Sequence, residues 1–499
     1  MRSFYQFLLL PIGICLLGTT MAQKTDLPAG FTPREREQLA TGDFVITGDR
    51  GIETPPPYDN LRAMAEWEEI QALTIAWTSY PGILKQIVRE AKEETMVIIL
   101  SENPSSTESY LMGSQAGGPL DNMDNVTIID ANFDSIWIRD YAGNPVYGNE
   151  VDDLVMVDWI YNRPNRPNDD ASPQVIADHL GLDLYCITEA PTDLVNTGGN
   201  FMCDGFGTAF ASELILEEND ANNPYDVTPK SAEEIDQIML DFLGLDRYIK
   251  METLPYDEIH HIDMHMKLLD EETLLVGQFP EGESDGPQLN ANIEYVLSNF
   301  NSKWGTPYKI IWIPMPPSSQ GFYPPDAYYR TYTNAVFVNK KVLLPVYNDN
   351  SDPEALAIWE EALPGYEIVG IDCDDNPEVI IAASGAIHCI THAVGVEDPM
   401  LISHQALPDT EDNVNPYIVN AYIKHRDGIA NASLFWKTDI NGSYTEVAMT
   451  DAGNDIWTGA IPAQDFGTTV YYYVRGEATT GKVQVRPMTA PDGYWKFNV

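Results

Sequence analysis

Residues 72–100 read ALTIAWTSYPGILKQIVREAKEETMVIIL and contain two apolar runs separated by a helical pattern. Ala72–Trp77 and Met96–Leu100 are short and rich in apolar residues, which is typical of buried strands. Between them, the apolar residues of Ile83–Glu93 recur at the spacing of a helix. A strand, a helix and a second strand in succession predict an α/β fold.

The same alternation continues along the chain and predicts one α/β body over residues 61–408. Further strands are expected at Val126–Ile129, Leu154–Ile160, Thr208–Ala211, Thr273–Val276, Ile310–Ile313, Ala335–Val338, Val342–Pro345 and Glu367–Ile371. Helices are expected at Pro173–His179, Ala232–Leu243, Leu289–Phe300 and Pro353–Ala362.

The pattern changes in residues 409–499, where apolar and polar residues alternate in short runs. These runs are Ser433–Thr438, Thr445–Thr450, Trp457–Ile461, Thr469–Arg475 and Lys482–Arg486. Turn signals such as Asn441-Gly442 separate them, so we expect a small immunoglobulin-like β-sandwich. No chemistry is evident in this part, which is interpreted as a spacer or binding module.

The N-terminus has the pattern of a signal peptide at residues 1–22. Arg2 supplies a positive charge, Phe7–Leu17 is apolar, and Thr20–Ala22 is a small-residue cleavage site. We therefore expect a secreted protein, whether extracellular, periplasmic or on the cell surface, with no transmembrane segment. Residues 23–60 are polar, end near three consecutive prolines and are interpreted as a leader or linker.

The chain of 499 residues is strongly acidic, with 28 Lys and Arg against 76 Asp and Glu and a net charge of −48. This balance argues against nucleic acid and anionic membranes as partners, because both require basic surfaces. It suits a cationic substrate, or simply a well-solvated exported protein. Whether Cys186 and Cys203 are bridged stays open, and a free cysteine in such a protein is a candidate reactive thiol.

Four short motifs could carry chemistry. Trp-Ile-Arg-Asp at 137–140 could be functional or form a structural ion pair. Thr-Gly-Gly-Asn at 197–200 indicates a close backbone approach or a plain turn. Ser-Gly-Ala-Ile-His-Cys-Ile-Thr-His at 384–392 contains Cys389, either a thiolate nucleophile or a small buried apolar residue.

The fourth motif is His-His-Ile-Asp-Met-His at 260–265. On a strand, His261, Asp263 and His265 would share one face, because side chains alternate. These residues could then provide an acid/base group with a cation-binding carboxylate, bind a metal, or merely pack in the core.

Taken in the order in which they occur along the chain, the four motifs resemble the guanidino-modifying (pentein) superfamily, and within it the bacterial peptidylarginine deiminase and agmatine deiminase group. The resemblance covers about residues 61–405 and includes Ala-Glu-Trp-Glu at 65–68. It implies a five-bladed α/β propeller of repeated ββαβ units, followed here by the β-sandwich.

The resemblance assigns roles to individual residues. Cys389 matches the nucleophile, His261 the general acid/base, and Asp140 and Asp263 the carboxylates that clamp the guanidinium. Substrate contacts are implied for Arg163, Arg166, Asn334, Trp137, Gly199 and Asn200. A planar, permanently cationic guanidinium suits paired carboxylates and attack by a thiolate, and the resemblance implies no cofactor and no metal.

The expected substrate is arginine in peptides or proteins. Asn-Arg-Pro-Asn-Arg-Pro-Asn-Asp at 162–169 resembles a segment of secreted peptidylarginine deiminases in which two arginines face the substrate carboxylate. Agmatine lacks that carboxylate, so deimination of agmatine or free arginine is the alternative. A non-catalytic surface-binding protein is the alternative of another class. A structural cation is possible at Asp372–Asn376 or near Asp121 and Asp124.

Overall fold

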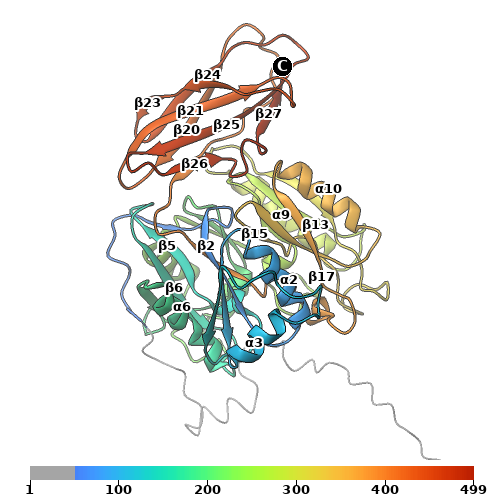
Figure 1. The fold of residues 1–499 in the computed structure, drawn as a ribbon. Coiled ribbons are helices and arrows are strands. Elements are labelled where there is room, and N and C mark those ends of the chain that lie inside the picture. The colour runs from blue at the N-terminus through green and yellow to red at the C-terminus, as the bar shows by residue number, and fades with distance from the viewer. Residues whose placement is uncertain (1–50) are drawn as a thin grey trace, which may run out of the picture.

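The structure, a computed structural model, describes residues 51–499 (Figure 1). The predicted signal peptide and residues 23–50 of the predicted leader lie outside the described residues. A larger α/β body is followed by a smaller unit built of strands, drawn in orange and red in Figure 1. In the described part of the chain, no helix is both long and apolar enough to cross a membrane.

The strand–helix–strand unit predicted from residues 72–100 is confirmed. Strands β2 (Ile70–Ala76) and β3 (Met96–Ser101) pair in parallel, and α2 (Pro81–Ala91) connects them. The apolar face of α2 is buried, which explains the helical spacing in the sequence. Strands β4 (Val126–Asp130) and β18 (His392–Gly395) complete this sheet, so it joins the two ends of the body.

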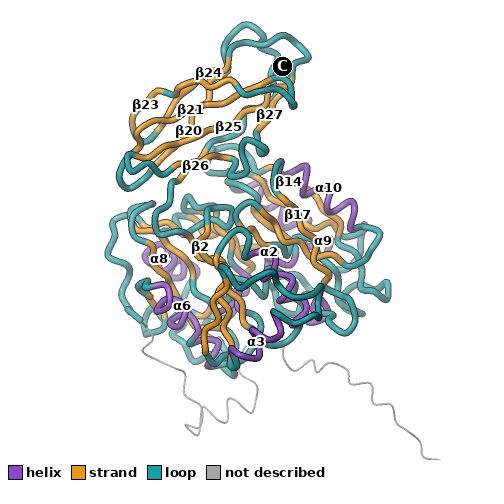
Figure 2. Tube along the Cα trace, in the orientation of Figure 1, coloured by secondary structure: helices purple, strands orange, loops and turns teal. Residues whose placement is uncertain are grey.

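Five sheets of the body repeat one arrangement, in which an antiparallel pair is followed by a helix and a parallel strand. Besides the unit of β2, α2 and β3, the four other units are β5 (Asn144–Gly148), β6 (Leu154–Tyr161), α6 (Ser172–Leu180), β7 (Leu184–Ile187); β9 (Met202–Cys203), β10 (Thr208–Ser212), α8 (Ala232–Leu243), β11 (Arg247–Met251); β12 (Met266–Leu268), β13 (Thr273–Gln278), α9 (Gly286–Asn299), β14 (Lys309–Pro314); and β15 (Val336–Val338), β16 (Lys341–Val346), α10 (Asp352–Ala362), β17 (Glu367–Asp372). Helices α6, α8 and α10 lie toward the outside of the body (Figure 2).

The predicted helices and strands of the body are all present, with boundaries shifted by a few residues. Six strands of the repeated sheets were not predicted, namely β5, β7, β9, β11, β12 and β18. Strands β9 and β12 contain only two or three residues, which carry too little periodicity to be recognised. The short elements outside the repeat are β1 (Leu61–Ala63), α3 (Pro104–Leu111), α4 (Ile138–Tyr141), α5 (Pro167–Asp170), β8 (Val195–Asn196) and α7 (Leu214–Glu217).

The C-terminal unit consists of two antiparallel sheets around an apolar core that includes Val419, Leu434 and Phe497. One sheet contains β19 (Leu401–Ser403), β20 (Tyr417–Lys424), β24 (Ile456–Ile461) and β23 (Thr450–Gly453). The other contains β22 (Thr445–Ala448), β21 (Ile429–Lys437), β25 (Thr469–Ala478), β26 (Val483–Arg486) and β27 (Trp495–Asn498). Strand β19 precedes residue 409, so this sheet begins within the range expected for the body.

Polar contacts join the two units. The Ser403 hydroxyl donates to Glu271 Oε1 over 2.6 Å and accepts from Lys303 Nζ over 2.9 Å. Lys482 pairs with Glu69 at 3.0 Å. The sheet that begins at β19 is therefore tied to the body by its first strand.

Tyr472→Phe should destabilise the C-terminal unit by about 1–3 kcal/mol, because it leaves buried groups without a partner. The Tyr472 hydroxyl accepts from the Leu407 backbone N–H at 2.7 Å and lies 3.0 Å from His404 Nε2. The measurement is the urea midpoint of the unfolding transition. Tyr471→Phe, at a partly buried neighbour, is the control, and equal midpoints for the two variants would contradict the prediction.

Candidate active site

Six of the residues predicted from the sequence line one small cavity, namely Trp137, Asp140, Arg163, Arg166, His261 and Cys389. Tyr161, Ile259, Ala383 and Ser384 complete its lining. Asp140 lies on α4, both arginines follow β6, and Cys389 precedes β18. The structure thus brings together residues that are up to 252 positions apart in the chain.

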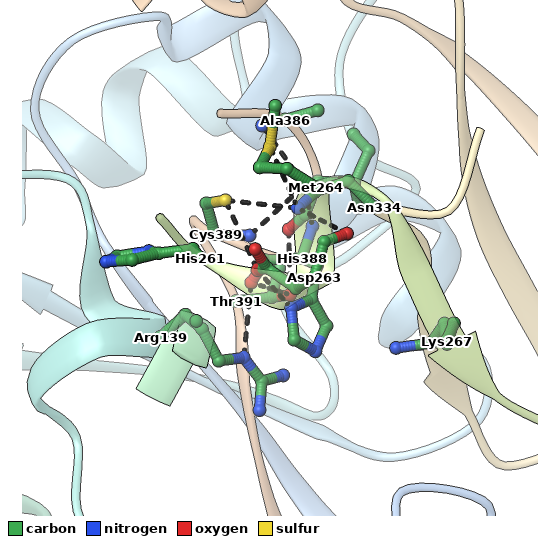
Figure 3. Close-up of polar contacts among 12 residues, drawn as sticks. Arg139, His261, Asp263, Met264, Lys267, Asn334, Ala386, His388, Cys389 and Thr391 are labelled. Atoms are coloured by element: carbon green, nitrogen blue, oxygen red, sulfur yellow. Dashed lines mark hydrogen bonds and ion pairs between the residues drawn. The ribbon is translucent and has the colours of Figure 1, made fainter. Parts of the chain in front are cut away.

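Asn334 and Asp263 contact the sulfur of Cys389 (Figure 3). The Asn334 side-chain amide lies 3.2 Å from Sγ, and Asp263 Oδ2 lies 3.5 Å from it. Asn334 Oδ1 also accepts from the backbone N–H groups of Ala386 and His388, each at 3.1 Å. Asn334 therefore positions the loop of the predicted nucleophile, although its predicted role was contact with substrate.

A buried chain of charges behind Cys389 was not predicted. His388 lies between two carboxylates, with Nδ1 2.7 Å from Asp263 and Nε2 2.8 Å from Glu66. Glu66 Oε2 in turn accepts from Lys267 Nζ over 2.6 Å. His388 can donate from both ring nitrogens only as an imidazolium, so the chain alternates in charge. Its only sequence signal was His388 next to Cys389 and Glu66 in the Ala-Glu-Trp-Glu motif.

This chain of charges keeps both carboxylates ionised. Burial raises the pKa of Asp263, but the hydrogen bond from His388 and the positive charges nearby outweigh it, so the pKa is lowered. For Glu66, burial is likewise outweighed by His388, Lys267 and Arg139, and the pKa falls well below its ordinary value. Asp263 is thereby available as an anion beside the thiol.

The thiol of Cys389 has the opposite tendency. Burial and the nearby carboxylates of Asp263 and Asp140 raise its pKa well above the ordinary value. The neutral thiol is therefore the stable form in the free protein. A cation that entered the cavity would favour the thiolate, because it would compensate the same two carboxylates.

His261 lies next to Asp140, with Nδ1 3.6 Å from Asp140 Oδ1. Its Nε2 is buried and has no hydrogen-bond partner among the described residues, which leaves it available for proton transfer. Gly199 donates its backbone N–H to Asp140 Oδ1 over 3.1 Å. A Cβ atom at Gly199 would lie 2.4 Å from His261 Nδ1, so only glycine allows this approach.

Two expectations for the site differ from the structure. Residues 262–264 form a 3-10 turn instead of a strand, so His261, Asp263 and His265 do not share one face. Their ligand atoms do not converge on one point as a metal site requires. Within residues 51–499, only Asp398, His425 and Asp427 bring their ligand atoms close enough together to hold a metal ion. Asn200 accepts from and donates to the backbone of Ser212 with its side-chain amide, so it holds a loop and does not line the cavity.

The remaining predictions concern loops and cysteines outside the cavity. Arg330 pairs with Asp374, so an arginine compensates the loop that was considered for a cation. Asp121 and Asp124 are exposed. Cys186 and Cys203 are both buried, and no disulfide joins them.

Proteins of similar sequence match this chain over nearly the whole of their own length. A protein of Latilactobacillus sakei named "Putative agmatine deiminase" is 24% identical over 69% of this chain and 98% of its own. One from Shewanella baltica with the same name is 26% identical and is covered over 96% of its length.

Solved structures support the fold. A "putative arginine deiminase" from Porphyromonas gingivalis matches with a TM-score of 0.57 at 20% identity, over 67% of this chain and 98% of that one. The agmatine deiminase of Enterococcus faecalis also matches with a TM-score of 0.57 at 20% identity, over 70% and 99% of the two chains.

Alkylation of Cys389 by iodoacetamide should accelerate about tenfold per pH unit between pH 7 and 9, because the thiolate reacts and the raised pKa keeps it scarce. The rate at Cys389 is measured by mass spectrometry of its peptide, with Cys389→Ser as the control. A rate that levels off near pH 7 would show an ordinary or lowered pKa instead.

The family model for Porphyromonas-type peptidyl-arginine deiminases matches residues 62–394. This range contains the cavity with Cys389, His261 and Asp140, and the charges behind it. The chain therefore belongs to the Porphyromonas-type peptidyl-arginine deiminase family.

Proposed function

We propose that the protein is a secreted deiminase that converts arginine in peptides or proteins to citrulline and ammonia. The observation that carries the proposal is one cavity that combines Cys389 and His261 with the carboxylate of Asp140 and two arginines, while a second carboxylate, Asp263, contacts the sulfur of Cys389. The carboxylates suit a guanidinium and the arginines suit a substrate carboxylate. The predicted signal peptide supports secretion.

In the proposed mechanism, Asp140 and Asp263 hold the guanidinium so that its central carbon faces Cys389. Asp263 Oδ1 is buried without a hydrogen-bond partner among the described residues, so it can accept from the substrate. As the substrate binds, Cys389 transfers its proton to His261, the thiolate attacks the guanidinium carbon, and His261 passes this proton to the departing ammonia. His261 then takes one proton from water as the water oxygen attacks the thiouronium carbon. The carbon–sulfur bond breaks to give the citrulline product, and the remaining proton of that water returns to the sulfur.

Two arginines favour arginine peptides over agmatine. Arg163 donates from Nη1 to the Asn162 side chain at 2.9 Å, and Arg166 donates to the Tyr161 hydroxyl at 3.1 Å. Both are held at the cavity and would attract a carboxylate and repel a second cationic group. Deimination of agmatine is the second candidate, because the relatives above carry that name.

The proposal extends to the architecture. We infer that the five repeated sheets form a five-bladed propeller and that the C-terminal unit is an immunoglobulin-like β-sandwich. The five-fold repeat and the closing strand β18 support the first inference, and the two packed antiparallel sheets support the second. The deciding assay for function measures citrulline formed from free arginine and from peptides with C-terminal or internal arginine, and carbamoylputrescine formed from agmatine.

Cys389→Ala should abolish turnover while the unfolding midpoint stays close to that of the wild type, since the covalent step needs the thiolate. His261→Ala should also cripple turnover. His265→Ala is the matched control and should be mild, because His265 does not line the cavity and burial lowers its pKa to about 4. Near-normal activity of Cys389→Ala would refute the mechanism.

Arg163→Ala should lower kcat/KM for peptides ending in arginine by roughly 10–150-fold, because it removes a charge-assisted contact worth about 1.5–3 kcal/mol. Agmatine turnover should stay unchanged or improve, since a repelling charge is gone. Equal losses for both substrates would indicate a structural role for Arg163 and favour the agmatine alternative.

A further inference from the structure

A second cavity, which we call the acidic groove, adjoins the cavity of Cys389. Its volume is about 340 Å³. Its lining includes three carboxylates and three tyrosines, namely Tyr256, Asp257, Glu258, Asp326, Tyr328 and Tyr329. Ser384 lines both cavities, so the groove begins at the rim of the proposed active site. No basic residue is found among the described residues that line it.

Two buried polar atoms in the lining of the groove have no hydrogen-bond partner among the described residues. Asp257 is 8% exposed, and its Oδ1 accepts from the Ile259 backbone N–H over 3.0 Å while Oδ2 accepts nothing. Tyr329 is 6% exposed, and its hydroxyl also lacks a partner. Buried polar groups are normally satisfied, so this pair indicates a place where a ligand or water donates.

The charges of the groove define the ligand. Asp257 and Asp326 form no ion pair with the described residues, so no described side chain compensates the negative charge of these two carboxylates. A cation is favoured there, because a partly desolvated carboxylate interacts strongly with it. Tyrosine rings add a further attraction for cations. A lysine or arginine side chain is the cation that a peptide can place among these carboxylates and tyrosine rings.

The position of the groove defines where this side chain belongs in a substrate. Arg163 and Arg166 line the cavity of Cys389 but not the groove. If they hold the carboxylate of a C-terminal arginine, the residues before that arginine leave by another part of the rim. We propose that the acidic groove binds a lysine or arginine side chain shortly before the target arginine. This inference rests on the proposed function and adds a preference for basic peptides.

The test compares acetylated tetrapeptides that end in arginine and carry lysine, glutamine or glutamate at the second or third position. Agmatine is assayed in parallel, and kcat/KM is obtained from citrulline or carbamoylputrescine release. We expect kcat/KM to be higher for the lysine peptide than for the glutamine peptide, and higher for the glutamine peptide than for the glutamate peptide. At one of the two positions, the lysine and glutamate peptides should differ at least tenfold. The range should shrink at high salt, because exposed charges are screened.

Variants locate the preference. Asp257→Asn keeps the Oδ1 acceptor for Ile259 and removes the buried charge, and Asp326→Asn removes an exposed charge of the groove. Each variant should reduce severalfold the ratio of kcat/KM for the lysine peptide to kcat/KM for the glutamate peptide. The double variant should bring this ratio near one. The ratio is taken within each variant, so a change in overall activity does not affect it. Glu294→Gln, an exposed substitution on α9 outside both cavities, is the control and should leave the ratio unchanged.

The outcomes separate the two proposals. If peptides are deiminated with equal kcat/KM for lysine and glutamate, the groove proposal fails while the proposed function stands. If the preference exists but Glu294→Gln lowers it as much as Asp257→Asn, the preference reflects overall charge and the groove proposal fails. If only agmatine is turned over, the proposed function fails and the groove proposal with it.

Discussion

Asp263 is a buried carboxylate beside the Cys389 thiol, and its negative charge has to be compensated inside the protein. His388 provides the compensating positive charge. Glu66 and Lys267 extend the chain of alternating negative and positive charges beyond His388. Removing one member of such a buried network leaves an uncompensated charge, which typically costs about 3–5 kcal/mol. The loops that carry Asp263, Cys389 and Glu66 are therefore bound to one another by electrostatics.

The same network prepares the site for a cation. Asp140 and Asp263 face a thiol whose pKa is raised by burial and by these two carboxylates. A guanidinium compensates both carboxylates at once and thereby favours the thiolate that would attack it. The net charge of −48 does not by itself indicate this selectivity, because it is spread over the whole chain. The placement of two carboxylates next to one sulfur indicates this selectivity for a cation.

The repeated sheets explain how distant residues meet. Glu66, Asp140, His261, Asn334 and Cys389 each lie in a connection between two different sheets of the body. Strand β18 follows Cys389 directly and pairs with β2, which follows Glu66. The pairing that joins the ends of the body therefore also brings the first and last segments of the site together.

The sequence alone determined the α/β body, the strand-rich C-terminal part and most residues of the cavity. Helix periodicity and strand patterns depend on neighbours in the chain, and short motifs such as His-Cys keep their chemistry wherever they fold. The partners of His388 are 125 and 322 positions away, and no local pattern indicates them. For the same reason the 3-10 turn after His261, the Ser212 contacts of Asn200 and the acidic groove became evident only in the tertiary structure. Hydrogen bonds and cavities depend on which loops the sheets bring together.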